Sequence, residues 1–533
     1  MSPVRASGST KSPAFAFANL PFWLLLAMPL ALLLVLGSFP NQDGPIRLYY
    51  ADIYRSLLAG SGTYSAYFKI KHILPPYMLA DYLLIGLMSF LPPLLAERIF
   101  LCLYTIVMAL GFRSLLRALN TGSGALAVCI IPFVLHKFIY LGFYQFSLGV
   151  ALALIACGEY LRDPEGVRGW RRVRFLALLA VIMLSHPIPL FAVLLVIGTY
   201  ILISICETAK RLDGTWRRRI REAGRAHSNL LVTAAFSCCI PLYVLKFVQK
   251  GGERTETASS GVLLKLGKLA LFGPISPFQV WYYALPLGLL VLMVGVSWAI
   301  CFWRRKAVLS KPRMTLFAVA AVCVIIYVVA PDQLNGSWGF DQRFPLFALL
   351  LTMAAMASEG ALQHGRYRNV IVVAAIIVGI GTFAYQARIS SRLQGASSLY
   401  QLPRVQPGSL GVIIRMLPPR TGLGFSPYEH IAAYYFEASH AILMNAPWLE
   451  LGISPIEYKD SFKPVVPVGA PGESVANYSP VPDFVLVVGP SASIESSPTA
   501  AQLAAYGYRK EWGTDIVSVF RRGPRSLGYN SPL

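Results

Sequence analysis

Residues 20–38 read LPFWLLLAMPLALLLVLGS, and residues 39–60, which follow, read FPNQDGPIRLYYADIYRSLLAG. The first stretch is apolar throughout and is long enough to span the hydrocarbon core of a bilayer. The second stretch places Asp43 close to the membrane surface, where a carboxylate costs free energy unless a partner or a function offsets that cost. The sequence thus predicts a membrane-spanning helix followed at once by a candidate functional residue.

The segment before this helix, residues 1–17, is basic and carries Arg5 and Lys11, and no signal-peptide cleavage site follows the helix. A basic flank on a retained first helix favours a cytoplasmic N-terminus. We therefore expect the helix to be an anchor and Asp43 to face the extracytoplasmic side.

Composition sets the class of protein. Of the 533 residues, 56% are hydrophobic and 14% are charged, which excludes a water-soluble globular protein and predicts a polytopic α-helical membrane protein. The net charge is +22, but the basic residues lie in short connectors between apolar runs, where they orient helices. We expect no nucleic-acid partner.

Three basic connectors, 162–174, 207–228 and 304–313, hold more than a third of the 47 lysines and arginines. Short basic loops favour the cytoplasmic side. The apolar stretches that lead to such connectors, 122–161 and 175–206, must then each cross the membrane twice.

Proline-containing breaks explain how each apolar stretch can turn back. SHPIPL at 185–190 interrupts one stretch, and IPFVLHKFIYLGFYQF at 131–146 interrupts the other. Prolines end helices because they lack a backbone donor and clash with the preceding turn. The sequence predicts two hairpins whose polar tips point outward.

About eleven crossings result, with both hairpins contributing two each. Residues 39–94 stay outside and include a juxtamembrane helix at 75–93, whereas 112–124 form a cytoplasmic loop. The remaining crossings are expected at 20–38, 95–111, 229–247, 279–303, 314–331, 342–358 and 368–387.

The composition changes near the end of the last crossing. Hydrophobic runs shorten, and proline, glycine, serine and tyrosine become more frequent. We therefore expect a transmembrane domain at 1–389 and a small extracytoplasmic α/β domain at 390–533. Its expected elements are a helix at 429–442, a strand at 483–489, a helix at 499–508 and a strand at 515–522.

Costly polar side chains recur on the predicted outer side. A carboxylate beside cations in such a place can take a proton from a nucleophile while the cations hold a phosphate. The candidate residues are Asp43, Arg47, His136, Lys137, His186, Asp332, Asp341 and Arg343.

Structural interpretations stay open for each of these residues. Asp43 would, in the alternative, cap a helix starting near Pro45. His186 would satisfy backbone groups at the hairpin break, and His136 with Lys137 would be interfacial side chains. Asp341 and Arg343 would form a local ion pair at a helix start.

The arrangement resembles the membrane-embedded glycosyltransferases of the GT-C fold, which use sugars linked to polyprenyl phosphate. The resemblance covers nearly the whole chain. It rests on the two hairpins and on four stretches: QDGPIRLYYADIYRSLLAG (42–60), HILPPYMLADYLLIGLMSFLPPLLAERIFLCLYTIV (72–107), FDQRFPLFALLL (340–351) and PDFVLVVG (482–489).

The resemblance implies that Asp43 is the catalytic base. Gly44 stands where many members of the family have a second acidic residue, so the expected reaction is an inverting displacement that needs no metal and no other cofactor. The resemblance further implies that His186 is the basic residue at the hairpin break and that Arg343 contacts the lipid phosphate, with Lys137 or Arg47 as further contacts.

Under this reading the chain is a multi-pass protein of the cell (inner) membrane. Its donor would be a polyprenyl-phosphate-linked sugar, its acceptor an extracytoplasmic glycan, lipid or protein, and membrane lipids would surround it. The alternatives are a lipid or sugar transporter or flippase, a polymerase of lipid-linked polysaccharide, and a non-catalytic membrane scaffold.

Overall fold

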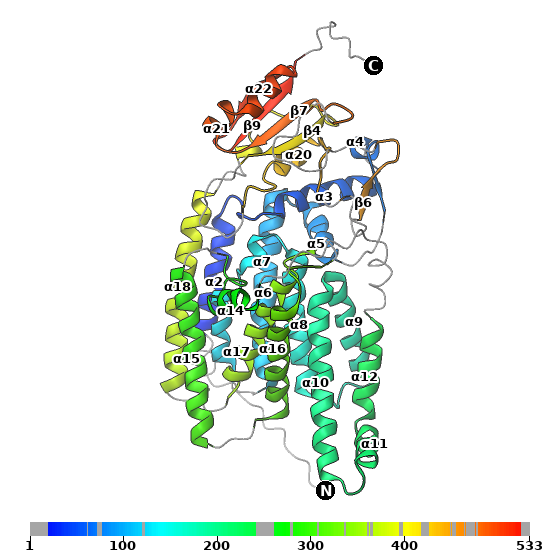
Figure 1. The fold of residues 1–533 in the computed structure, drawn as a ribbon, viewed down its shortest axis with the longest axis vertical. Coiled ribbons are helices and arrows are strands. Elements are labelled where there is room, and N and C mark those ends of the chain that lie inside the picture. The colour runs from blue at the N-terminus through cyan, green and yellow to red at the C-terminus, as the bar shows by residue number, and fades with distance from the viewer. Residues whose placement is uncertain are drawn as a thin grey trace, which may run out of the picture.

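A computed structural model describes residues 20–60, 62–71, 77–119, 123–240, 261–277, 281–305, 309–334, 337–359, 362, 366–393, 398–416, 426–447, 449, 455–462, 464, 475 and 478–523. Its helices form an elongated bundle, and a smaller part that contains a β-sheet sits on one end of the bundle, at the top of Figure 1. The basic segment 1–17 lies outside the described residues.

The bundle consists mainly of long helices that run along its axis (Figure 1). Their bounds are α2 Leu20–Val35, α6 Pro93–Leu119, η1 Ser123–Phe133, α8 Tyr144–Arg162, α9 Gly169–Ser185, α10 Pro187–Arg211, α12 Ser228–Cys239, α15 Trp281–Arg305, α16 Lys311–Val329, α17 Phe344–Ala357 and α18 Arg366–Arg392. Shorter elements connect them: α3 Gly44–Leu58, α4 Gly62–Ser65, α5 Leu79–Met88, α7 Lys137–Tyr140, α11 Trp216–Ala226, α14 Val262–Ala270 and η2 Asp341–Arg343.

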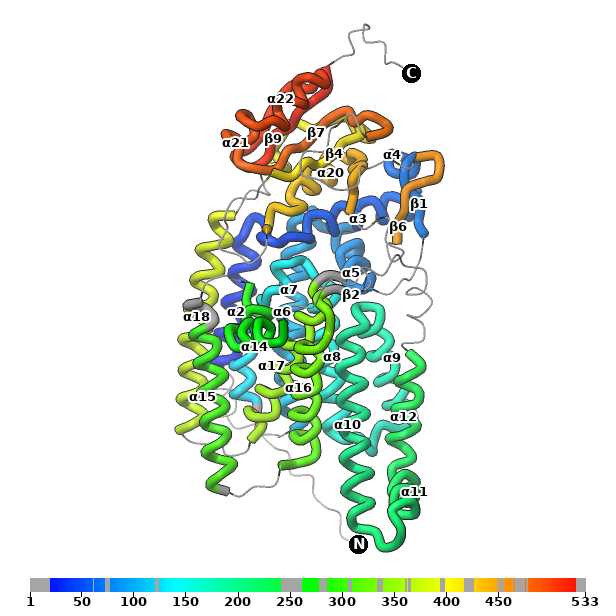
Figure 2. Tube along the Cα trace, viewed as in Figure 1, coloured from blue at the N-terminus to red at the C-terminus, as the bar shows by residue number. Residues whose placement is uncertain are grey.

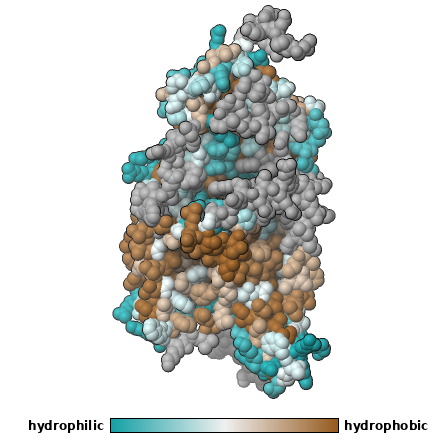
Figure 3. Space-filling view, viewed as in Figure 1, coloured by the Kyte–Doolittle hydropathy of each residue, from teal (hydrophilic) through white to brown (hydrophobic). Residues whose placement is uncertain are grey.

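Among the described residues, six helices are long and apolar enough to cross a membrane: Pro93–Leu119, Tyr144–Arg162, Pro187–Arg211, Leu285–Arg304, Lys311–Val329 and Arg366–Arg392. Hydrophobic side chains form a broad band across the face of the bundle seen in Figure 3. The expectation of a polytopic α-helical membrane protein is confirmed at this level. The expected crossing at 229–247 begins as α12, and its residues after 240 lie outside the described part of the chain.

The two predicted breaks are present. The helix α9 ends at Ser185 and α10 begins at Pro187, with His186 in an extended conformation between them. Figure 2 shows the chain reversing direction at this point, so that α9 and α10 lie side by side. In the other stretch, η1 leads into the short helix α7 at the tip, and α8 runs back.

One predicted boundary is wrong. The expected crossing 95–111 with a loop at 112–124 is a single helix, α6, that continues to Leu119. Phe112, Leu115 and Leu116 are fully buried, and a Cβ on Gly158 of α8 would lie 3.0 Å from the backbone nitrogen of Leu115. This close packing extends the helix through a segment whose polar residues suggested a loop.

The smaller part contains a five-stranded sheet in the order β5-β4-β7-β9-β8. The strands β4 and β5 run parallel to one another, as do β4 and β7, whereas β9 is antiparallel to β7 and β8. The bounds are β4 Leu410–Arg415, β5 Ile442–Leu443, β7 Phe484–Val488, β8 Tyr508–Gly513 and β9 Val517–Arg522, with helices α20 Ala433–Ser439, α21 Ser491–Glu495 and α22 Pro498–Ala505.

The α/β character of the tail is confirmed, and four predicted elements correspond to α20, β7, α22 and β9. The strands β4, β5 and β8 were not predicted. The expected domain boundary after residue 389 falls in the last turn of α18. Two small antiparallel pairs complete the described strands: β1 Phe68–Ile70 with β6 Ile456–Tyr458, and β2 Gln333–Leu334 with β3 Ser337–Trp338.

Helix α3 lies crosswise between the bundle and the sheet-containing part (Figure 1). The Tyr49 hydroxyl of α3 donates to the carbonyl of Ala441 and accepts from the backbone N–H of Leu443, both at 2.9 Å. Buried apolar residues of the two parts form one continuous cluster. The N-terminal end of α3, where Asp43 lies, is therefore positioned by both parts.

Candidate functional site

Asp43 immediately precedes α3, and its side chain is buried, with 3% of the residue exposed. The carboxylate makes no capping hydrogen bond to α3. Instead, the side-chain oxygen of Asn41 accepts a hydrogen bond from the backbone N–H of Gly44. The capping interpretation of Asp43 is therefore wrong, because a neighbouring residue fills that role.

A histidine from the sheet-containing part faces this carboxylate. The Nε2 atom of His430 lies 3.6 Å from Oδ1 of Asp43, and among the described residues this Oδ1 atom has no hydrogen-bond partner. Arg415 of β4 lies 3.4 Å from Nδ1 of His430. Because a guanidinium can only donate, Nδ1 accepts and the ring hydrogen is on Nε2, directed at Asp43.

Burial dominates the titration of both groups. It raises the pKa of Asp43 to about 7, an effect that Arg47 opposes and Glu429 reinforces. Burial lowers the pKa of His430 to about 3, helped by the positive charge of Arg415. Near neutral pH the site therefore holds a partly ionised carboxyl group and a neutral histidine beside it.

The tip of the first hairpin packs directly on the Asp43 backbone. Gly142 has a positive φ of 75°, and a Cβ at this position would lie 2.8 Å from Cβ of Asp43. The backbone N–H of Gln42 donates to the carbonyl of Tyr140 at 2.9 Å. Only glycine allows this approach without displacing Asp43.

Arg47, one turn into α3, stabilises the contact between the hairpin tip and the segment that carries Asp43. Its Nε donates to the carbonyl of Gly142 at 2.7 Å, and its guanidinium pairs with Asp81 of α5 at 3.3 Å. Arg47 thus binds protein groups on two sides, while its charge still lowers the pKa of Asp43. Its predicted role as a substrate ligand stays a prediction.

His186 and Arg343 come together from distant segments. The Nδ1 atom of His186 accepts a hydrogen bond from the backbone N–H of Ile188 at 3.1 Å. The ring hydrogen of His186 is therefore on Nε2. This Nε2 atom lies 3.4 Å from a terminal nitrogen of Arg343. Both side chains are buried. Since neither nitrogen can accept from the other, the two groups together present donors that suit an anionic oxygen.

Aromatic rings hold this pair against the hairpin tip that contacts Asp43. The guanidinium of Arg343 lies over the rings of Phe143 and Phe146, at 5.2 and 5.8 Å from their centroids. The ring of Tyr77 meets His186 edge-on at 4.8 Å. The segment 140–146 therefore contacts Asp43 through Gly142 and Arg343 through its phenylalanines.

The alternative interpretation of Asp341 and Arg343 as a local ion pair is not borne out, because no such pair is observed. Asp341 instead pairs with Lys265 of α14 at 2.9 Å. Lys137 donates to the side-chain oxygen of Gln342 at 2.9 Å, and burial lowers the pKa of Lys137 to about 8. Lys137 and Asp341 thus position the short helix η2 that carries Arg343.

His136 has a structural role in α7. Its Nδ1 accepts the backbone N–H of Phe138 at 3.2 Å, and its Nε2 lies 3.0 Å from the hydroxyl of Tyr104. The Tyr104 hydroxyl in turn donates to the carbonyl of Val134 at 2.9 Å. Both ring nitrogens are therefore engaged by protein groups.

Sequence reasoning missed a buried carboxylate that organises the Asp43 loop. Glu97 of α6 accepts hydrogen bonds from Asn41 at 3.1 Å, from Tyr144 at 2.6 Å and from Tyr434 of α20 at 3.2 Å. Glu97 thus connects the bundle, the loop before α3 and the sheet-containing part. Its position in an apolar helix was the signal, since a carboxylate there needs partners.

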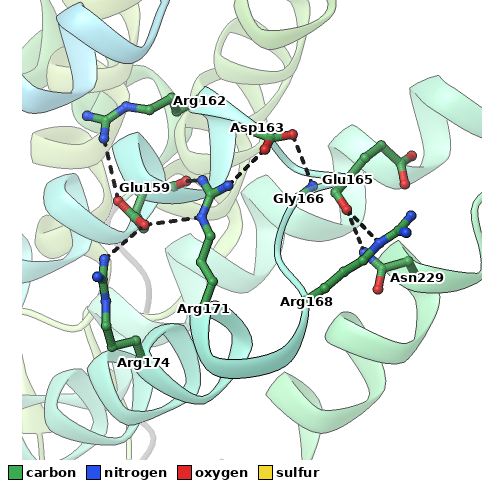
Figure 4. Close-up of polar contacts among 9 residues, drawn as sticks. All are labelled: Glu159, Arg162, Asp163, Glu165, Gly166, Arg168, Arg171, Arg174 and Asn229. Atoms are coloured by element: carbon green, nitrogen blue, oxygen red, sulfur yellow. Dashed lines mark hydrogen bonds and ion pairs between the residues drawn. The ribbon is translucent and has the colours of Figure 1, made fainter.

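A second group of charges surrounds the connector between α8 and α9 (Figure 4). Glu159 lies 3.4 Å from Arg171 and 3.3 Å from Arg174, and Arg171 donates to Asp163 at 2.8 Å. These side chains are partly exposed and pair with one another. They hold the connector in place, and we assign them no chemistry.

Within the described residues, no group of three or more histidine, cysteine, aspartate or glutamate side chains is placed to hold a metal ion. Comparison of the chain with protein-family models and with curated proteins gave no match. The site geometry is therefore the basis for assigning a function.

Proposed function

We propose that the chain is a membrane-embedded glycosyltransferase of the GT-C type, which moves a sugar from a polyprenyl-phosphate donor to an extracytoplasmic acceptor. One observation carries the proposal. A buried carboxyl group with a pKa of about 7 and a pair of buried donors contact the same hairpin tip, 140–146. A base and a phosphate site held by one segment suit the transfer of a phosphate-linked group.

The proposed topology has about eleven crossings, with the N-terminus cytoplasmic and the sheet-containing part outside the cell (inner) membrane. The placement of the basic connectors supports it. The segments 162–174 and 207–228 lie at the end of the bundle opposite the sheet (Figure 1). Short basic connectors favour the cytoplasmic side, so Asp43 and the sheet belong to the outer side.

In the proposed reaction, the ionised carboxylate of Asp43 takes the proton of an acceptor hydroxyl. The hydroxyl oxygen forms a bond to the anomeric carbon while the bond from that carbon to the phosphate oxygen breaks. Polyprenyl phosphate leaves with the bonding electrons, and the configuration at the anomeric carbon inverts. Arg343 and the Nε2 hydrogen of His186 stabilise the charge on the phosphate.

His430 adds a feature to this scheme. Its Nε2 hydrogen faces Oδ1 of Asp43 across 3.6 Å, which exceeds hydrogen-bond length. In the proposed reaction, the acceptor hydroxyl binds beside both groups, and His430 donates to its oxygen while Asp43 removes its proton. The sheet-containing part would thereby take part in selecting the acceptor.

Donor turnover tests the function directly. Purified protein is incubated with a panel of polyprenyl-phosphate sugars, and release of polyprenyl phosphate is measured in parallel for the wild type and Asp43→Asn. We expect one donor to be consumed by the wild type only. Movement of labelled donor across vesicle membranes without sugar release would instead support a transporter or flippase.

A further inference from the structure

The helix α14, Val262–Ala270, turns Lys265 inward and most of its aliphatic side chains outward, while its second lysine, Lys268, is exposed. Lys265 is 1% exposed, whereas Leu263 is 85%, Leu264 is 56% and Val262 is 53% exposed. A helix on a water-exposed surface buries its apolar residues and exposes its charges. The buried Lys265 and the exposed Val262, Leu263 and Leu264 reverse this arrangement, which indicates that these three aliphatic side chains do not contact water.

Lys265 holds α14 against the end of α16 and the start of η2. Its ammonium lies 3.0 Å from Asp332 and 2.9 Å from Asp341, and it donates to the carbonyls of Tyr327 at 3.3 Å and Ala330 at 2.6 Å. Four acceptors thus offset the cost of burying the charge. The orientation of α14 is fixed by this contact, so the exposure of its leucines is built into the fold.

The surroundings of α14 are those of the bilayer edge. Figure 1 shows α14 end-on, crosswise to α15 and α16, and Figure 3 shows hydrophobic side chains in this region that continue into the band across this face of the bundle. A protein interface would have a polar rim around an apolar centre. Continuity with the band instead identifies lipid acyl chains as the occupant.

We propose that α14 is an interfacial membrane helix whose aliphatic face inserts among lipid acyl chains of the leaflet nearest the sheet-containing part. Lys265 then links this lipid contact to η2, which carries Arg343 two residues after Asp341. The bilayer would fix the depth of the Arg343 guanidinium. This last step rests on the proposed function, since it concerns the phosphate of a lipid-linked donor.

Photo-crosslinking of the full chain in nanodiscs tests the lipid contact without any assay of activity. Benzoylphenylalanine replaces Leu263, and the matched positions are Leu202 on α10, 62% exposed, and Val481 in the sheet-containing part, 38% exposed. We expect lipid adducts at 263 and 202 and none at 481. Lipid adducts at 263 no more frequent than at 481, or protein adducts in their place, would overturn the proposal.

The link to η2 has its own test. Lys265→Met removes the contact with Asp341, and Lys268→Met removes an exposed charge from the same helix. We expect a KM for the lipid-linked donor about 10-fold higher in Lys265→Met, an unchanged kcat, and partial rescue by Lys265→Arg. Equal KM values for the two methionine variants contradict the link. A wild type that consumes no donor contradicts the proposed function and leaves the crosslinking result intact.

Discussion

The Oδ1 atom of Asp43 lies 3.6 Å from Nε2 of His430, which brings a residue after the first helix against a residue of the sheet-containing part. Both side chains are almost fully buried. The candidate base therefore lies at the junction of two parts of the molecule. Changes in either part should alter its chemistry.

Replacing Asp43 by Asn should abolish sugar transfer. The amide keeps the shape of the side chain but cannot take a proton, and a positioned base commonly contributes roughly 100- to 10,000-fold to a rate. Donor turnover measures the loss, and Asp460→Asn serves as the control because the Asp460 side chain is 97% exposed. Near-normal turnover by Asp43→Asn would remove Asp43 from the mechanism.

Turnover should rise with pH through the range set by Asp43. Because the base acts when ionised, the acid limb of the rate profile should have its midpoint near the pKa of about 7. Arg415 lowers this pKa and Glu429 raises it. Arg415→Gln should therefore move the limb to higher pH and Glu429→Gln to lower pH, each by a few tenths of a unit because both side chains are partly solvated. Shifts of the same sign in both variants would contradict this assignment.

The raised pKa of Asp43 also predicts a pH-dependent stability. The folded state holds the proton up to a pKa of about 7, against 3.8 for an unperturbed aspartate, so the wild type loses stability as pH rises from about 4 to about 7. Asp43→Asn, which cannot ionise, escapes this loss and should be more stable at pH 8 by about 2–4 kcal/mol. Thermal unfolding in detergent at pH 4.5 and pH 8 measures it. An equal difference at the two pH values would show that the Asp43 pKa is not raised.

Donor binding should depend on the planar guanidinium of Arg343. Lysine keeps the charge but loses the paired donors, so Arg343→Lys should weaken binding of a polyprenyl-phosphate sugar partly and Arg343→Ala severely. Acceptor affinity should change little. Wild-type donor affinity in Arg343→Ala would leave Arg343 as a packing partner of Phe143 and Phe146.

His186 variants should reduce turnover more than donor affinity.

Single cysteines introduced at exposed positions should report the proposed topology. Membrane-impermeant reagent added outside should label position 460 and leave positions 168 and 220 unlabelled, because basic connectors favour the cytoplasmic side. Outside labelling at 220 would place the candidate site on the wrong side of the membrane. Permeabilised cells provide the control that all three positions can react.

The sequence revealed the features whose physical cause is local. Asp43 was identified because a carboxylate next to an apolar helix has a visible cost, and the break at His186 was identified from Pro187 and Pro189, which follow it. His430 and Arg415 had no such signal, since their approach to Asp43 depends on how the sheet docks on α3. The pairing of Asp341 with Lys265 was likewise hidden in the packing of α14.

The contacts of Asp43 and Glu97 also set the order in which this part of the structure is completed as the chain is synthesised. Glu97 and Asp43 leave the ribosome early, yet their partners Tyr434 and His430 are made only after the last bundle helix. In the nascent chain these contacts therefore stay incomplete until the sheet-containing part has been made and has folded against α3. Truncation after α18 would leave the carboxylates of Glu97 and Asp43 without these two partners.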